Sequence, residues 1–351
     1  MLAGTAMVFV ALSAAPASAH GTAQVPATDY VVRVQSMTPP IPGVTLRSVD
    51  NGARFELRND SGSDVTVLGY DPTNEPYLRI GPDGVFENVH SPAVYWNKSA
   101  FITSTPPAQY DARKAPEWRK LSSGNVARWH DHRAHYLGGS PAKGASPVVL
   151  RWTLPLEYSG NRASISGDDV FVRPSSALPY LGLAAVVAIG LFAAARRRSW
   201  PIVLAISLAV LVGAAIVQAV GEWGAVTLSV GSRIGEHIYV FAGVALGIAA
   251  IVWVLRRRGS PFDATPIALL AGLALLLASG LTGLPLLTHS EIPTTLPFAV
   301  DRTLIALTIG TGAAVVAIAA TKLRPPFQAR PARPQESSTA TEILRSMYVE
   351  K

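Results

Sequence analysis

Short stretches of alternating apolar and polar residues fill the chain from residue 20 to 176, and long apolar runs follow them. In Arg54 to Arg58, for example, two apolar side chains alternate with three charged ones. This period of two is typical of a strand with one face in a protein core and the other in water. The dipeptides Asn51-Gly52 and Asp83-Gly84 each separate two such stretches, and both tolerate the positive φ of a tight hairpin turn. We therefore predict antiparallel β-structure for this part.

About seven or eight short strands with turns between them favour an all-β sandwich of immunoglobulin-like or cupredoxin-like shape. The residues from Ser99 to Ser123 include Pro106, Pro107 and Pro116. They predict a long irregular loop, and loops of that length are often functional. The stretches predicted as strands are Tyr30–Gln35, Val44–Val49, Arg54–Arg58, Val65–Leu68, Tyr77–Ile80, Val85–Asn88, Val148–Leu154 and Val170–Val172.

Five later stretches are long and apolar enough to cross a bilayer as helices. They predict a bundle of about five transmembrane helices, with the lipid bilayer as the partner of this part of the chain. The stretches are Leu178–Ala195, Pro201–Val220, Ile238–Leu255, Ile267–Leu287 and Leu304–Ala320.

Basic residues gather after alternate apolar stretches. Arg196 to Arg198 follow the first stretch, Arg256 to Arg258 follow the third, and a basic tail begins near Lys322 after the fifth. Because such clusters mark cytoplasmic ends, they place the N-terminal domain outside the cell membrane and the C-terminus in the cytoplasm. Membrane topology thus accounts for the formal net charge of +7, so nucleic acid is not a predicted partner.

The N-terminal residues have the pattern of an export signal. An apolar run in Met1 to Ala19 ends in Ala17-Ser18-Ala19, the small-residue pattern that a signal peptidase accepts. Cleavage there makes His20 the first mature residue; an uncleaved helix is the alternative. The predicted organisation is a signal peptide (1–19), an extracytoplasmic domain (20–177), a transmembrane domain (178–321) and a disordered cytoplasmic tail (322–351). The chain has no cysteine, which excludes disulfides and thiolate chemistry.

The densest group of ionisable residues comprises His130, Asp131, His132 and His135. In an extended segment His130 and His132 share a face, whereas in a helix His132 and His135 do. Imidazole is a favoured ligand of copper, zinc and nickel, and Asp131 is a candidate ligand or ring-orienting group. This segment is the predicted metal site, with copper as the predicted cofactor.

A free N-terminus at His20 strengthens the prediction of a copper site. Its amine and imidazole form a bidentate chelate that suits tetragonal Cu(II), and one imidazole from the cluster completes a three-nitrogen site. Arg128 and Arg133 flank the cluster and would repel a cation. A structural polar cluster and a protein-contact surface are therefore the alternatives.

Ionisable residues near the ends of apolar runs are secondary candidates. They are predicted either to gather at one outer mouth together with Glu222 or to be ordinary loop residues in water. The secondary metal-ligand candidates are Glu236, His237, His289 and Glu291.

An exported β-domain that begins with histidine and continues into several membrane helices resembles certain bacterial copper-resistance proteins. In that family a copper-binding β-sandwich is fused to a copper-import membrane domain. The resemblance rests on architecture, His20 and the Asp/His cluster, and it implies a copper-handling role for His20 and His132. The spacing differs, because the family has an Asp-x-His near the end of its sandwich, whereas further predicted strands follow His132 here. Methionine-rich ligand tracts are also absent.

The leading hypothesis is a membrane-anchored extracytoplasmic protein that binds and handles copper. One alternative is a non-catalytic envelope scaffold whose sandwich binds a protein partner, and another is a copper oxidase with a histidine-brace site. The sequence has no Gly-rich phosphate loop, nucleophile elbow or paired-carboxylate motif, so an enzyme is the less favoured interpretation.

Overall fold

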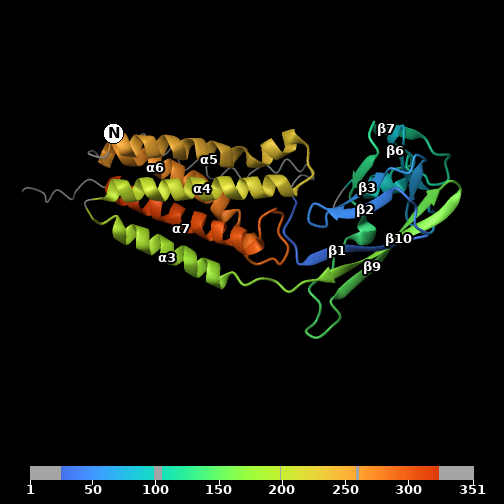
Figure 1. Ribbon diagram of the computed structural model, residues 1–351, viewed down its shortest axis with the longest axis horizontal. Helices are drawn as coiled ribbons and strands as arrows, with labels where there is room; N and C mark the ends of the chain where they lie inside the picture. Colours follow the sequence, from blue (N-terminus) through green and yellow to red (C-terminus); the bar gives the residue numbers. More distant parts are fainter. Residues whose placement is uncertain (1–24, 99–104, 198, 258–260, 324–351) are drawn as a thin grey trace, which may run out of the picture.

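A β-domain and a helix bundle lie end to end in the computed structural model (Figure 1). The structure describes residues 25–98, 105–197, 199–257 and 261–323. The predicted signal peptide, His20 and nearly all of the predicted tail lie outside these residues.

The β-domain consists of two antiparallel sheets. A seven-stranded sheet has the order β1-β10-β9-β4-β5-β6-β7, and a three-stranded sheet has the order β2-β3-β8. All the predicted strands are present, and Asn51, Gly52 and Gly84 have the positive φ expected of their turns. The strands are β1 (Tyr30–Thr38), β2 (Val44–Val49), β3 (Arg54–Asn59), β4 (Val65–Leu68), β5 (Pro76–Gly81), β6 (Gly84–Asn88), β7 (Trp118–Ser122), β8 (Val126–Trp129), β9 (Val148–Tyr158) and β10 (Asn161–Phe171).

Two strands and one short helix were not predicted. Strand β7 pairs with β6 at the edge of the large sheet, so the prediction of an irregular loop is wrong for Trp118–Ser122. Strand β8 pairs with β3 and leads directly into the histidine cluster. Helix α2 (Pro92–Trp96) begins after Ser91, whose hydroxyl accepts the backbone N–H of Ala93, which is the usual N-cap arrangement.

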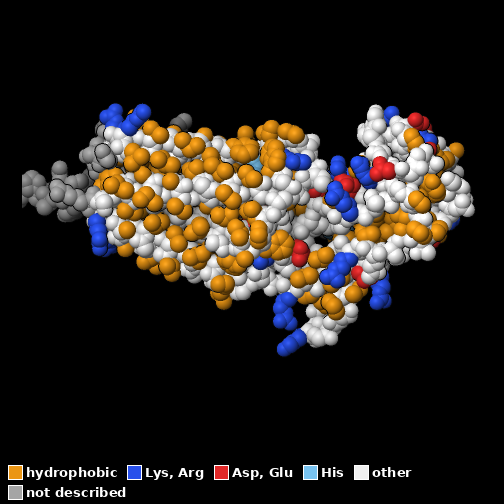
Figure 2. Space-filling model, viewed as in Figure 1, with side chains coloured by type: hydrophobic (Ala, Val, Ile, Leu, Met, Phe, Trp, Pro, Cys, Tyr) orange, Lys and Arg blue, Asp and Glu red, His pale blue; other side chains and the backbone are white. Residues whose placement is uncertain are grey.

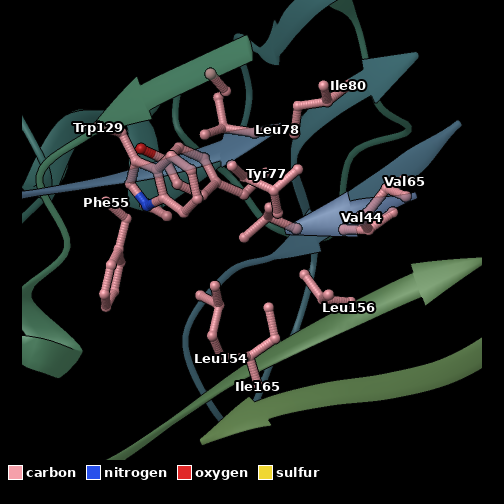
Figure 3. Close-up of a cluster of buried hydrophobic side chains, with 14 of the residues drawn as sticks. Val44, Phe55, Val65, Tyr77, Leu78, Ile80, Trp129, Leu154, Leu156 and Ile165 are labelled. Carbon is pink, nitrogen blue, oxygen red and sulfur yellow. The ribbon is translucent and has the colours of Figure 1, made fainter. Parts of the chain in front are cut away.

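The inner faces of the two sheets share one hydrophobic core (Figure 3). Phe55 and Trp129 come from the small sheet, and their ring centroids are 5.9 Å apart. Leu154 and Ile165 come from the large sheet and are 0% and 1% exposed. Each fully buried side chain of this size contributes about 1.5–3 kcal/mol to folding. The end of β8, where the histidine cluster begins, is therefore anchored by the packing of Trp129.

Four helices are long and apolar enough to cross a membrane among the described residues: Trp200–Ala225, Val230–Arg256, Ala264–Leu281 and Phe298–Leu323. Helix α3 is apolar but shorter, with 17 residues. Figure 2 shows a mainly hydrophobic flank along the bundle, which suits a lipid bilayer. The bundle elements are α3 (Leu178–Ala194), α4 (Trp200–Ala225), α5 (Val230–Arg256), α6 (Pro261–Leu275), the π-helix η2 (Leu276–Leu281), the 3₁₀-helix η3 (Leu284–Leu287) and α7 (Phe298–Leu323).

Hydrogen bonds join the β-domain to loops at one end of the bundle. Thr28 and Glu291 exchange two backbone hydrogen bonds of 2.9 Å each. The carboxylate of Asp50 accepts the backbone N–H of Thr227 at 2.6 Å and its hydroxyl at 2.7 Å. The carboxylate of Asp29 accepts the backbone N–H of Ser290 at 2.8 Å. These contacts fix the β-domain against the bundle.

Candidate functional site

The three clustered histidines lie at the junction between β8 and the 3₁₀-helix η1 (His132–Ala134). The segment is neither extended nor α-helical throughout, because Asp131 caps η1 by accepting the backbone N–H of Arg133 at 3.1 Å. The turn brings all three imidazoles together. The ring centroid of His130 is 4.7 Å from that of His132 and 5.0 Å from that of His135.

Backbone carbonyls fix the tautomers of two of these rings. Nδ1 of His130 is 2.8 Å from the carbonyl oxygen of Ala53, and Nε2 of His132 is 3.1 Å from that of Trp96. A carbonyl can only accept, so each of these ring nitrogens carries the proton and donates. The other nitrogens, Nε2 of His130 and Nδ1 of His132, are buried without a hydrogen-bond partner among the described residues. Each of these two nitrogens therefore keeps a free lone pair. A metal-ligating histidine has the same arrangement, because one ring nitrogen binds the metal while the other donates to a second-shell acceptor.

Burial keeps the imidazoles of His130 and His135 neutral. Burial, together with the smaller effects of the neighbouring His130 and His132, lowers the pKa of His135 to about 4. Burial also lowers the pKa of His130, against the opposing effect of its hydrogen bond to Ala53. At neutral pH the rings of His130 and His135 are therefore unprotonated, which is the form that binds a metal.

The carboxylate of Asp131, a predicted ligand or ring-orienting group, bonds neighbouring protein groups. It accepts a hydrogen bond from Nε1 of Trp129 at 2.9 Å. It also accepts hydrogen bonds from Nε and Nη2 of Arg133 at 2.8 and 2.7 Å, in addition to the bond from the backbone N–H that it caps. Burial, the largest single influence, would raise the pKa of Asp131, but the charge and hydrogen bonds of Arg133 together with the hydrogen bond of Trp129 outweigh it and the pKa is lowered. Four hydrogen bonds match the roughly four acceptor positions of a carboxylate. Asp131 therefore shapes the turn, and its oxygens are already engaged.

Both flanking arginines have acidic partners, although Glu56, the partner of Arg128, also pairs with Arg47. Arg133 pairs with Asp131, and Nε of Arg128 lies 2.6 Å from Oε2 of Glu56 on the neighbouring strand. The repulsion expected between these arginines and a cation at the histidines is therefore partly compensated.

Sequence reasoning missed several residues that build this site. The hydroxyl of Tyr70 accepts the backbone N–H of His132 at 3.2 Å and donates to Oδ1 of Asn97 at 2.5 Å. The guanidinium of Arg133 lies over the ring of Tyr70, 4.9 Å from its centroid. Only the tertiary fold brings Ala53, Tyr70 and Asn97 to the histidines, so the sequence contained no local signal for them.

The described residues contain no group of three or more His, Asp or Glu side chains arranged to hold a metal ion. The predicted ligand His20 lies outside the described residues. The structure therefore supplies two oriented imidazole nitrogens, from His130 and His132, with His135 beside them.

The secondary candidates divide into two places. His237 and Glu236 are on α5, where Nε2 of His237 is 3.4 Å from Oε2 of Glu222 on α4. His289 and Glu291 instead lie at the junction with the β-domain, where Nδ1 of His289 is 3.2 Å from Oδ2 of Asp29. Burial raises the pKa of Glu291.

A short path of contacts connects the histidines to the bundle. The carbonyl of Ala53, which holds His130, belongs to the turn between β2 and β3. In the same turn the N–H of Ala53 donates to the carbonyl of Asp50 at 3.0 Å, and the carboxylate of Asp50 binds Thr227 between α4 and α5. One turn thus contacts both the candidate site and the membrane domain.

Comparison of the chain with protein-family models, curated proteins and solved structures gives no match. The function is therefore inferred from the site itself.

Proposed function

We propose that this protein is a membrane-anchored, extracytoplasmic metal-binding protein that handles copper through the histidine cluster. The supporting observation is the pair of buried nitrogens, Nε2 of His130 and Nδ1 of His132, that have no partner among the described residues. Each belongs to a ring whose other nitrogen is bound by a backbone carbonyl. Leaving such nitrogens unsatisfied is unfavourable, and a metal ion would satisfy both.

Copper is the favoured metal because the available donors are neutral imidazole nitrogens. Such nitrogens bind Cu(II) more strongly than the other divalent metals of the first row. Two donors alone are too few for a tight site, so a third comes either from His20 or from His135, whose ring is adjacent to His130 and would have to reorient on binding. A bound copper ion would cross-link the turn after β8 and hold the three rings in a single orientation.

The turn between β2 and β3 suggests how the metal affects the membrane domain. Because Ala53 holds His130 and Asp50 holds Thr227, a shift of His130 on metal binding moves the same turn that contacts the bundle. The β-domain then delivers copper to the bundle, or signals its presence, through this contact.

The same proposal includes the finer points of architecture. The β-domain is an immunoglobulin-like or cupredoxin-like sandwich that is exported by a cleaved signal peptide. Helix α3 crosses the membrane as a fifth span, so the β-domain lies outside and the C-terminus lies in the cytoplasm. The basic clusters at the bundle end away from the β-domain support this orientation (Figure 2).

The test is Cu(II) binding by the full-length protein in detergent at pH 7.5, followed by titration and metal analysis. We expect one tightly bound copper per chain. The substitutions His130→Ala and His132→Ala should each weaken binding at least tenfold, because each removes one donor. His90→Ala is the matched control, since Nδ1 of His90 bonds the carbonyl of Ala115, away from the cluster.

Copper binding that is equal in all four proteins would place the site elsewhere. A folded protein that binds no copper would refute the proposal and favour the envelope-scaffold alternative.

A further inference from the structure

A second polar cluster lies inside the helix bundle, at the end that contacts the β-domain. Gln218 on α4 is 3% exposed and Ser279 in the π-helix η2 is 5% exposed. Nε2 of Gln218 donates to Oε1 of Glu222 at 3.2 Å, and the hydroxyl of Ser279 donates to Oε1 of Gln218 at 3.0 Å. Amide, hydroxyl and carboxylate groups inside an apolar bundle are costly and usually functional.

These groups surround a small cavity. Its volume is about 30 Å³, and its polar lining comes from Gln218, Glu222, Ser279 and Thr282. A cavity of this size holds one or two water-sized particles. The polar lining consists mainly of oxygen donors, which favour hard cations over copper.

The negative charge around this cavity is incompletely compensated. Nε2 of His237 lies 3.4 Å from Oε2 of Glu222, and a protonated His237 offsets part of the negative charge of Glu222. Asp301, at the same end of the bundle, is 0% exposed, and its Oδ2 has no hydrogen-bond partner in the described part of the chain. A fully buried carboxylate such as Asp301 is unfavourable without a compensating positive charge, whereas the side chain of Glu222 is 29% exposed.

The nearest guanidinium groups on these helices are used elsewhere. Arg302, next to Asp301, donates to the backbone carbonyls of Leu286, His289 and Ser290. Arg233, one turn before His237, donates to the carbonyls of Leu228 and Trp223. Because these guanidinium donors bond backbone carbonyls, His237 is the potentially cationic partner of Glu222 within 4 Å among the described residues.

The backbone beside the cavity is irregular. Leu276–Leu281 forms a π-helix, and a 3₁₀-helix follows at Leu284–Leu287. A π-helix changes the hydrogen-bond pattern of its turn and is frequent at functional sites. Irregular backbone at membrane depth is tolerated where it lines a cavity, and it coordinates small cations in several transport proteins.

We propose that this pocket binds one small monovalent cation, Na⁺, from the aqueous phase on the β-domain side. Glu222 provides the charge, Gln218 and Ser279 provide neutral oxygens, and Asp301 adds a favourable electrostatic field. The lining contains a single carboxylate, Glu222, which balances a monovalent cation, whereas Ca²⁺ sites usually use several carboxylates and Mg²⁺ keeps several waters for which this cavity has no room. This site does not depend on copper binding at the histidine cluster.

The test is equilibrium binding of radioactive ²²Na⁺ to the full-length protein in lipid nanodiscs. Choline chloride, whose cation is too large for the cavity, holds the ionic strength constant. We expect saturable binding of one Na⁺ per chain. Glu222→Gln should weaken it at least tenfold, and Ser279→Ala should weaken it severalfold because only one neutral oxygen is lost. Glu117→Gln is the matched control, since the Glu117 side chain is 71% exposed on the β-domain and should bind Na⁺ as the wild type does.

Thermal unfolding in choline chloride establishes whether each variant is folded. If Glu222→Gln does not fold, the Na⁺ affinity of Ser279→Ala is used to test the proposal. No saturable Na⁺ binding by the wild type would overturn the proposal. Binding that persists unchanged in Glu222→Gln, or in Ser279→Ala where that variant carries the test, would also overturn it. Copper titration of the same preparations separates this result from the outcome at the histidine cluster.

Discussion

Replacing Asp131 by alanine should destabilise the β-domain strongly, because it breaks a buried ion pair. The side chains of Arg133 and Asp131 are 14% and 0% exposed, and two charge-assisted hydrogen bonds join them. In the variant the guanidinium of Arg133 keeps only its bonds to the carbonyls of Leu68 and Gly69, and the indole N–H of Trp129 loses its acceptor. Removing one partner of a buried pair costs about 3–5 kcal/mol, a large share of the roughly 5–15 kcal/mol that holds a domain folded.

The chain contains a matched control for this prediction. Asp111 accepts the backbone N–H, Nε and Nη2 of Arg113 at 3.0, 2.8 and 2.9 Å. This is the same Asp-x-Arg arrangement, but the Arg113 side chain is 89% exposed. Asp111→Ala should leave stability unchanged within error, because water replaces the lost partner.

Urea unfolding of a fragment of residues 25–176, followed by tryptophan fluorescence, measures both changes. A loss below about 1.5 kcal/mol for Asp131→Ala would contradict the burial argument. Equal losses in the two variants would show that geometry, and not burial, sets the strength of the pair.

Three further predictions concern the fold, the pH dependence of stability and the topology. The fragment 25–176 alone should be soluble with a mainly β circular dichroism spectrum, and a helical spectrum would contradict the two-sheet domain. Burial raises the pKa of Asp169 from 3.8 to about 7, so the folded state keeps a proton that the unfolded state has released, and stability falls as pH rises from about 4 to 7. Asp169→Asn should remove this loss and stabilise the fragment at pH 8 by up to about 4 kcal/mol, at roughly 1.36 kcal/mol per pKa unit; unchanged urea midpoints would refute this. Reporter fusions after Arg197 and Arg257 should be cytoplasmic and a fusion at Pro293 external, and an external reporter at Arg257 would overturn the orientation.

Most of the β-domain could be predicted because its strands bury one face. In β3, Phe55 and Leu57 are buried and alternate with charged residues, so the strand is visible in the sequence. The prediction that the charged residues face water is wrong for Glu56, which pairs with arginines on both neighbouring strands and is only 7% exposed. Strand β7 could not be predicted this way, since all its residues are exposed or partly exposed. Its position depends on backbone pairing with β6, which leaves no hydrophobic pattern.

The helix bundle was predicted well in type and less well in its bounds. Apolar composition identifies a membrane segment, but the start of α5 at Val230 is set by the hydroxyl of Ser229, which accepts the N–H of Ser232. The change from α6 to a π-helix at Leu276 likewise depends on packing against neighbouring helices. Buried Asp301 was missed because one carboxylate before an apolar run looks like an ordinary loop residue.

The candidate site shows the same division between local and tertiary information. His130, His132 and His135 are close in the sequence, so their proximity could be predicted. Their tautomers depend on the carbonyls of Ala53 and Trp96, which only the fold brings near. The role of Asp131 depends on burial, since the same Asp-x-Arg pattern at Asp111 lies on the surface.

The central claim is that copper binds the imidazoles of the histidine cluster, and pulsed electron paramagnetic resonance of the Cu(II)-loaded protein tests it most directly. This method detects the remote nitrogen of each coordinated imidazole. We expect the signals of at least two equatorial imidazoles in the wild type, and one fewer in His132→Ala, because Nδ1 of His132 is a proposed donor. A copper spectrum without imidazole nitrogens, or one that is identical in the wild type and His132→Ala, would contradict the account.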